Sequence, residues 1–176
     1  MRSISVANIF VRPRPGNRSQ GWLAVGAANI PVALGRSGIK ANKREGDGAT
    51  PRGRFRLVRL WWRADRGPPP RTLLPIRRIA ADDAWCEDPA HRRYNRPMRR
   101  PVDAPGDHLR RTDHLYDLII EIDHNSRPRV AGRGSAVFIH VARSGLSPTA
   151  GCVALTAERL RKLLVRCSAN TRITIG

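Results

Sequence analysis

Three segments in which apolar and polar residues alternate constrain the fold more than any other feature of this sequence. Residues 53–62, GRFRLVRLWW, have a period close to two, and residues 114–125, HLYDLIIEIDHN, and 135–142, SAVFIHVA, are rich in strand-forming residues. This periodicity is typical of half-buried strands. A turn that contains proline and glycine separates the last two segments. The pattern therefore predicts a protein built mainly from β-strands.

Two further patterns add elements at the ends of the chain. Residues 3–11 and 21–34 are predicted to form a hairpin around the turn PGNRSQG, and residues 171–175, TRITI, a last strand. Thr156 is a candidate N-cap for a helix over AERLRKLLVRC. The apolar stripe of this helix follows the i, i+3, i+4, i+7 spacing and consists of Leu160, Leu163, Leu164 and Cys167.

The middle of the chain has no clear periodicity. Residues 63–111 are dominated by proline, arginine and aspartate, which predicts a long irregular excursion with one short strand near 73–79. A chain of 176 residues has the length of one compact domain with a substantial core. We therefore expect residues 1–176 to form a single domain.

The charge of the chain points to an anionic partner. Lys and Arg number 33 against 14 Asp and Glu, for a formal net charge of +19. Arginine pairs well with carboxylates and phosphates, so nucleic acid, a membrane surface and an acidic cell-wall polymer are all candidates. Charge alone does not choose among them.

The cysteines do not form a disulfide framework or a metal site. There are three, Cys86, Cys152 and Cys167, and their spacing matches no zinc pattern. Cys167 is interpreted as a small core residue on the predicted helix. Cys86 lies in the polar stretch DDAWCEDP and is interpreted as incidental. No metal ligation is expected.

No segment of the sequence predicts a membrane anchor. No apolar run approaches the ~20 residues that a membrane-spanning helix needs. The opening, MRSISVANIFVRPRP, mixes polar residues and arginines into its apolar positions and is a poor match to a secretory signal. It is better interpreted as a first strand.

One histidine and one cysteine are candidates for a catalytic dyad. His140 ends a predicted strand, and Cys152 follows twelve residues later, after Gly151. A thiolate nucleophile needs a neighbouring base, which the intervening loop could bring close. Gly151 permits a sharp turn, so the amides of residues 151–152 could face an oxyanion. The alternative is a core cysteine and a strand-end histidine joined by a surface loop.

The segment SPTAGC resembles the nucleophile signature of the L,D-transpeptidase (YkuD) family, an [S/T]-H-G-C element preceded by a histidine that follows a strand. Thr149, Gly151 and Cys152 match this element, and His140 matches the upstream base. A second segment, KREGDGATPRGRFRL, resembles the family's upstream G-x-x-x-T-P-x-G-x-[FY] element. Its matching positions are Gly46, Thr50, Pro51, Gly53 and Phe55. The resemblance covers roughly residues 35–170.

The sequence departs from the family pattern in two ways. Ala150 stands where the family has a histidine before the glycine, and the interval between His140 and Cys152 is shorter than usual. These departures mark a compact, divergent branch. They leave the expected roles of Cys152 and His140 intact, and the shorter loop is expected to reshape the acceptor side of the cleft.

The resemblance implies a mainly β fold, a β-sandwich of two packed sheets with a helix after the cysteine. It also implies an enzyme that cross-links peptidoglycan stem peptides through a Cys152 thioester, with no cofactor, in the periplasm or cell envelope. Peptidoglycan would then be the anionic partner. L,D-carboxypeptidase or amidase chemistry is the nearest alternative. A non-catalytic nucleic-acid-binding module would explain the charge but neither motif.

Several other residues are candidates for the cleft. Arg143 could pair with a substrate carboxylate, or be a solvated loop arginine. His124 and Asn125 end a predicted strand and could line the cleft. Tyr94, Asn95 and Arg96 are a candidate lid over the cysteine. The two acidic residues of EGDG are interpreted as part of a turn that supports the T-P-x-G element. The histidines interpreted as surface residues are His91, His108 and His114.

Overall fold

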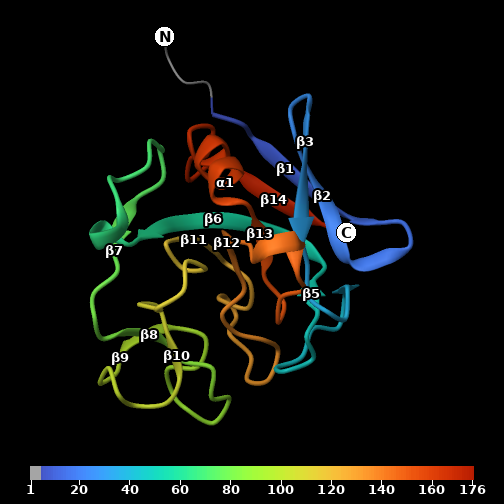
Figure 1. Ribbon diagram of the computed structural model, residues 1–176. Coiled ribbons are helices and arrows are strands. Elements are labelled where there is room, and N and C mark those ends of the chain that lie inside the picture. Colours follow the sequence, from blue (N-terminus) through green and yellow to red (C-terminus); the bar gives the residue numbers. More distant parts are fainter. Residues whose placement is uncertain (1–4) are drawn as a thin grey trace.

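The computed structural model describes residues 5–176, and strands dominate it (Figure 1). The largest sheet has nine strands in the order β11-β12-β13-β3-β2-β1-β14-β6-β7. These strands are β1 (Asn8–Arg14), β2 (Asn17–Val25), β3 (Ala28–Ala33), β6 (Gly53–Trp62), β7 (Ile76–Arg78), β11 (Leu118–Ile122), β12 (Phe138–Val141), β13 (Val153–Leu155) and β14 (Arg172–Ile175). The prediction of a mainly β protein is confirmed.

The pairings of this sheet close on themselves. β11 pairs with β12 along one edge and with β6 along the other, so every strand of the sheet except β7 belongs to a closed circuit. β1 and β14, from the two ends of the chain, pair in parallel within it. The expectation that the strands form two packed sheets stays a prediction.

Smaller elements surround the main sheet. In residues 5–176, a two-stranded and a three-stranded sheet accompany one α-helix and two 3₁₀ turns. They are β4 (Ile39–Lys40), β5 (Thr50–Pro51), β8 (Asp83–Trp85), β9 (Pro97–Arg99), β10 (Asp107–His108), α1 (Ala157–Leu164), η1 (Ala64–Arg66) and η2 (Ser144–Leu146). Within residues 5–176, no helix has both the length and the apolar character that crossing a bilayer requires.

The predicted helix forms where the apolar stripe indicated. Leu160, Leu163 and Leu164 are buried in the main core, together with Cys167, which lies just beyond the helix end. Thr156 is the N-cap residue, but its side chain makes no capping bond. Its backbone carbonyl accepts the amide of Leu160 instead. The prediction that the helix begins after Thr156 is therefore confirmed, and the helix ends at Leu164, three residues before Cys167.

The N-terminal hairpin is a three-stranded meander. β2 begins inside the predicted turn, and the segment 21–34 is interrupted at Gly26, whose φ of +57° suits a tight turn. Val25 pairs with Ala28 across that turn. Of the predicted strand 3–11, residues 3 and 4 lie outside the described residues.

Alternation along the strands produces two cores. In β12, Ile139 and Val141 enter the main core inside the strand circuit, while Phe138 enters a second core on the other face. Figure 1 shows α1 and the β8–β10 sheet on opposite sides of β6. The second core consists of Trp61, Ile79, Trp85, Leu109, Ile119, Ala136, Phe138 and Cys152.

The central segment, residues 63–111, covers this second core. Residues 63–111 contain β7, as predicted, but also the sheet β8–β10, which the irregular composition did not indicate. Its Trp85 packs edge-on against Phe138, with ring centroids 4.9 Å apart. Cys86, interpreted from its polar neighbours as incidental, is in fact buried at 1% exposure. Strands of two or three residues are too short to show a period, so the sequence could not reveal them.

Candidate active site

The pairing of β12 and β13 places Cys152 and His140 on the same face. The two strands run parallel, with His140 opposite Ala154. Side chains of paired residues share a face, and residues two apart on a strand point the same way. Cys152 lies two residues before Ala154 and therefore shares the face of His140. Both side chains line one pocket of about 420 Å³.

The thiol of Cys152 is enclosed by backbone groups of the segment before β12. It donates a hydrogen bond to the carbonyl of Ala136 at 3.2 Å and accepts one from the amide of Phe138 at 3.3 Å. Burial raises the pKa of Cys152 to about 12, the Phe138 amide opposes the shift, and the carboxylates of Asp107 and Glu87 add to it. The thiol is therefore protonated at neutral pH.

The imidazole of His140 is held with one ring nitrogen free to accept a proton. Its Nδ1 lies 2.8 Å from the carbonyl of Val141, which can only accept a hydrogen bond, so Nδ1 carries the proton and Nε2 is the free basic nitrogen. Tyr116 packs edge-on against the ring, with centroids 5.4 Å apart. Burial lowers the pKa of His140 to about 4. Among residues 5–176, no hydrogen bond joins this ring to Cys152.

Gly151 makes the turn before the nucleophile, and only a glycine fits there. Its φ is +149°, and a Cβ at this position would lie 2.7 Å from the carbonyl oxygen of Ala49. Ala49 directly precedes the T-P-x-G element. The hydroxyl of Thr50 in that element accepts the amide of Gly35 at 2.8 Å, and Gly35 forms a bridge with Thr149. The second motif thus packs directly behind the cysteine turn.

The hydroxyl of Thr149 stabilises this turn through two hydrogen bonds. It donates to the carbonyl of Cys152 at 2.7 Å and accepts the amide of Gly151 at 3.1 Å. The Gly151 amide, expected to face an oxyanion, is therefore occupied in this structure. Among residues 5–176, no hydrogen-bond partner is found for the Cys152 amide, which remains available.

Arg143 stands at the edge of the pocket. It is exposed, precedes η2 and lines the pocket together with residues 147–152. Arg36, from the segment after β3, lines the same pocket. Its amide binds the carbonyl of Thr149, so the segment after β3 and the loop 142–151 each contribute an arginine to the pocket.

The remaining predicted site residues lie outside the pocket wall. Tyr94 and Asn95 are buried rather than forming a lid, and Arg96 borders a separate groove. Asn95 Oδ1 accepts the amide of Ala136 at 3.2 Å, and the Tyr94 hydroxyl accepts the amide of Gly134 at 3.0 Å. Tyr94 and Asn95 thus position the segment whose Ala136 carbonyl holds the thiol.

His124 and Asn125 also lie outside the pocket wall, and both bind backbone carbonyls of the loop 130–134. The ring of His124 packs edge-on against Phe55, and its Nε2 donates to the carbonyl of Arg133 at 3.1 Å. Asn125 binds both ends of the loop 130–134, through the carbonyls of Val130 and Gly134. Neither side chain lines the pocket of Cys152.

Several pocket residues had no expected role in the cleft. They are Arg36, Lys43, Glu87, Asp107, Arg111 and Tyr116, together with Glu45, which was interpreted as part of the EGDG turn but binds the hydroxyls of Tyr94 and Ser135. Lys43 and Glu45 belong to the segment that begins KREGDG, so their closeness to a family motif was the available signal. In that segment Asp47 supports the turn as expected, since it accepts the amides of Arg44 and Ala49. Glu87 and Asp107 lie in the excursion and carry no comparable signal.

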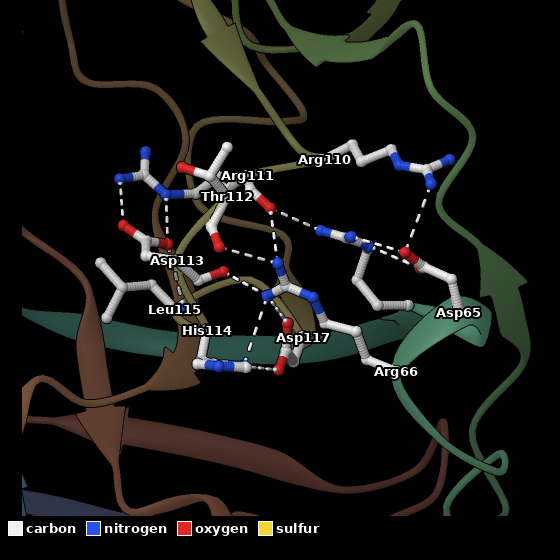
Figure 2. A network of polar contacts seen from close by, with 10 residues as sticks. Asp65, Arg66, Arg110, Arg111, Thr112, Asp113, His114, Leu115 and Asp117 are labelled. Carbon is white, nitrogen blue, oxygen red and sulfur yellow. Dashed lines mark hydrogen bonds and ion pairs between the residues drawn. The ribbon is translucent and has the colours of Figure 1, made fainter.

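The part of the excursion that returns to the pocket is anchored by a polar network (Figure 2). Arg66 binds Asp117 at 2.7 Å and also the backbone carbonyls of residues 111–113. Arg111 forms a two-bond pair with Asp113, at 2.9 and 2.7 Å. This network fixes the segment that brings Arg111 and Tyr116 into the pocket.

Among residues 5–176, no group of three or more His, Cys, Asp and Glu side chains could hold a metal ion.

The comparison with protein families agrees with this arrangement. The family model of the L,D-transpeptidase catalytic domain (YkuD) matches residues 12–175, nearly the whole chain. The protein therefore belongs to the L,D-transpeptidase catalytic domain family. No curated protein and no solved structure matched it.

Proposed function

We propose that this protein is a peptidoglycan L,D-transpeptidase that forms cross-links between stem peptides through a thioester on Cys152. The observation that carries the proposal is the shared face of Cys152 and His140 in one pocket, with His140 Nδ1 held by Val141 so that Nε2 is free. Membership of the family gives the substrate class. It also supports a place in the cell envelope.

In the proposed first step, the thiol of Cys152 exchanges its bond to Ala136 for one to Nε2 of His140. The proton moves to Nε2 as the sulfur attacks an amide carbonyl beside a diaminopimelate residue of the donor stem peptide. The tetrahedral intermediate collapses to a thioester, and His140 returns the proton to the departing amine. The raised pKa of Cys152 favours proton transfer during the attack over a preformed thiolate.

In the second step, an amine of a neighbouring stem peptide attacks the thioester and loses a proton to His140, which restores the thiol. Water in place of the amine would give L,D-carboxypeptidase or amidase products from the same intermediate. The amide of Cys152, which has no partner among the described residues, is the proposed oxyanion donor. The Gly151 amide could join it only by releasing Thr149.

We assign Arg143 the role of binding a carboxylate of the stem peptide, because it borders the pocket and is exposed to solvent. Thr149, Tyr94, Asn95, His124 and Asn125 act as positioning residues through the bonds described above. The general positive charge, +19, would hold the enzyme near the anionic wall polymer. We further propose that residues 1–176 form one catalytic domain with the layered β arrangement of a sandwich.

The proposal is tested by incubating the protein with purified sacculi and identifying the muropeptides by mass spectrometry. New cross-linked dimers are expected with the wild type and none with Cys152→Ala. The matched controls Cys86→Ala and Cys167→Ala change thiols outside the pocket and should retain activity. Shortened stem peptides without dimers would indicate hydrolysis. Retention on duplex DNA with no change in the muropeptides would favour the nucleic-acid-binding alternative.

A further inference from the structure

The pocket of Cys152 has an acidic wall, although the chain is strongly basic. Glu45, Glu87 and Asp107 line it, and the whole chain has only 14 acidic residues. Glu87 follows β8 and is exposed at the pocket, whereas Asp107 begins β10 and is partly buried. Both belong to the excursion that covers the second core.

These carboxylates are set apart by their lack of ion pairs. Nine of the 14 acidic side chains form ion pairs with described basic residues, namely Asp47, Asp65, Asp82, Asp83, Asp113, Asp117, Glu121, Asp123 and Glu158. Of the five without such a pair in residues 5–176, three line this pocket. Glu45 is satisfied by the hydroxyls of Tyr94 and Ser135. Glu87 and Asp107 are left without a cation despite the excess of arginine.

Asp107 contributes to this wall a carboxylate oxygen whose capacity to accept hydrogen bonds is not used. Its Oδ2 is buried and has no hydrogen-bond partner among residues 5–176. Arg111 lies near it, but the guanidinium of Arg111 is engaged by both oxygens of Asp113. Desolvation raises the pKa of Asp107 to about 6, against the opposing effects of Arg111 and a hydrogen bond with Tyr116. An unpaired buried carboxylate is costly, and a ligand that supplies positive N–H donors would relieve that cost.

We infer that Asp107 and Glu87 form a subsite that binds a primary ammonium group of the substrate beside Cys152. The pocket is also lined by four cations, of which Lys43 and Arg111 are paired with Asp47 and Asp113. Arg36 and Arg143 form no ion pair among residues 5–176, so the pocket suits a group that carries both an ammonium and a carboxylate. Under the proposed function, on which this inference rests, that group is a diamino acid of a stem peptide. The described residues offer no metal-binding cluster there.

Binding of an ammonium group at this subsite would also lower the pKa of the Cys152 thiol. The carboxylates of Asp107 and Glu87 both raise the pKa of Cys152. A bound ammonium group offsets their negative charge and so favours the thiolate that forms during attack. The subsite therefore couples recognition of the substrate amine to activation of the thiol.

The test measures binding without turnover, in the Cys152→Ala protein. Two synthetic stem peptides are compared by calorimetry, one with the free side-chain amine of its diamino acid and one with that amine acetylated. The free-amine peptide should bind ~10–100-fold more tightly, the range expected for a charge-assisted bond. Adding Asp107→Asn should reduce the preference to less than ~3-fold. Adding Asp103→Asn, which removes an exposed charge from the same excursion, should leave it unchanged.

Glu87→Gln supplies a second variant at an exposed position, where folding is not at risk, and should weaken the preference by ~3–10-fold. Equal affinity for the two peptides in the Cys152→Ala protein, or no binding of either, would overturn the subsite even if the wild type forms cross-links. A clear preference for the free amine without any cross-linking or hydrolysis by the wild type would leave the subsite standing and refute the proposed function.

Discussion

The thiol of Cys152 donates its hydrogen bond to the backbone carbonyl of Ala136, 3.2 Å away. Burial of the sulfur raises the pKa of Cys152 to about 12, and a thiol that donates this bond is in its neutral form. His140 is neutral as well, because its pKa is lowered to about 4. In this structure Cys152 and His140 are thus a pair of uncharged groups rather than a thiolate and an imidazolium.

We therefore expect slow alkylation of Cys152 in the free protein. Only the thiolate reacts, and with a pKa of about 12 its fraction is small at neutral pH. The iodoacetamide rate at Cys152, followed by peptide mass, should rise ~10-fold per pH unit from pH 7 to 9 and stay ~100-fold or more below that of free cysteine. A rate that is flat between pH 5 and 8 would instead indicate a preformed ion pair with His140.

Replacing the base should affect the chemical step and spare binding. His140→Ala is expected to lower kcat ~10²–10⁴-fold, the usual contribution of a general base, with little change in KM. His124→Ala is the matched control, since that ring lies outside the pocket and should cost less than ~10-fold. Cross-linking rates on sacculi measure both, and a larger loss in His124→Ala would show that the base is misassigned.

Gly151→Ala is expected to inactivate the enzyme because the new Cβ would lie 2.7 Å from the Ala49 carbonyl oxygen. Gly145→Ala is the control in the same loop: its φ is also positive, at +68°, but a Cβ there meets nothing within 4 Å. Both variants should lose ~1–2 kcal/mol of stability from backbone strain, and only Gly151→Ala should lose more through the clash. Urea unfolding and activity assays separate the two effects, and equal losses would contradict the steric argument.

The contribution of His140 to stability should decrease as the pH falls from about 6.5 to 4, whereas Glu87, whose pKa desolvation raises to about 7, should contribute in the opposite direction. His140 is buried with a pKa of about 4, below its unfolded value near 6.5, so the unfolded state binds more protons in this window. The loss attributable to His140 is up to ~3 kcal/mol. Asp107, whose pKa is raised to about 6, acts in the opposite direction, because its native state binds more protons between about pH 4 and 6.

The contribution of His140 is isolated by comparing the wild type with His140→Gln in urea unfolding at pH 7 and pH 4.5. The change from pH 7 to pH 4.5 should be less favourable for the wild type than for the variant, because only the wild type carries the buried neutral histidine. Equal changes in the two proteins would mean that the histidine is not held neutral by burial.

Much of the fold could be predicted, and Cys152 and His140 could be selected as candidates that prove to line one pocket, because the signals are local. Alternation in residues 53–62 and 135–142 directs side chains to two faces of a strand whatever packs against them. The stripe ending in Cys167 indicated the helix for the same reason. Cys152 and His140 were identified from a motif of a few residues. The sheet β8–β10 was missed, since strands of two or three residues carry no period.

The sequence by itself therefore determined the mainly β character and the helix after the cysteine, and it supplied the proposal that Cys152 is the nucleophile and His140 the base. Only the tertiary structure decided what surrounds them. It made Tyr94 and Asn95 supports of the segment 134–136 rather than a lid, engaged the Gly151 amide with Thr149, and brought Asp107 into the pocket of Cys152. The physical reason is that side-chain direction follows from neighbouring residues, whereas contacts between segments far apart depend on strand register and on how the two cores pack.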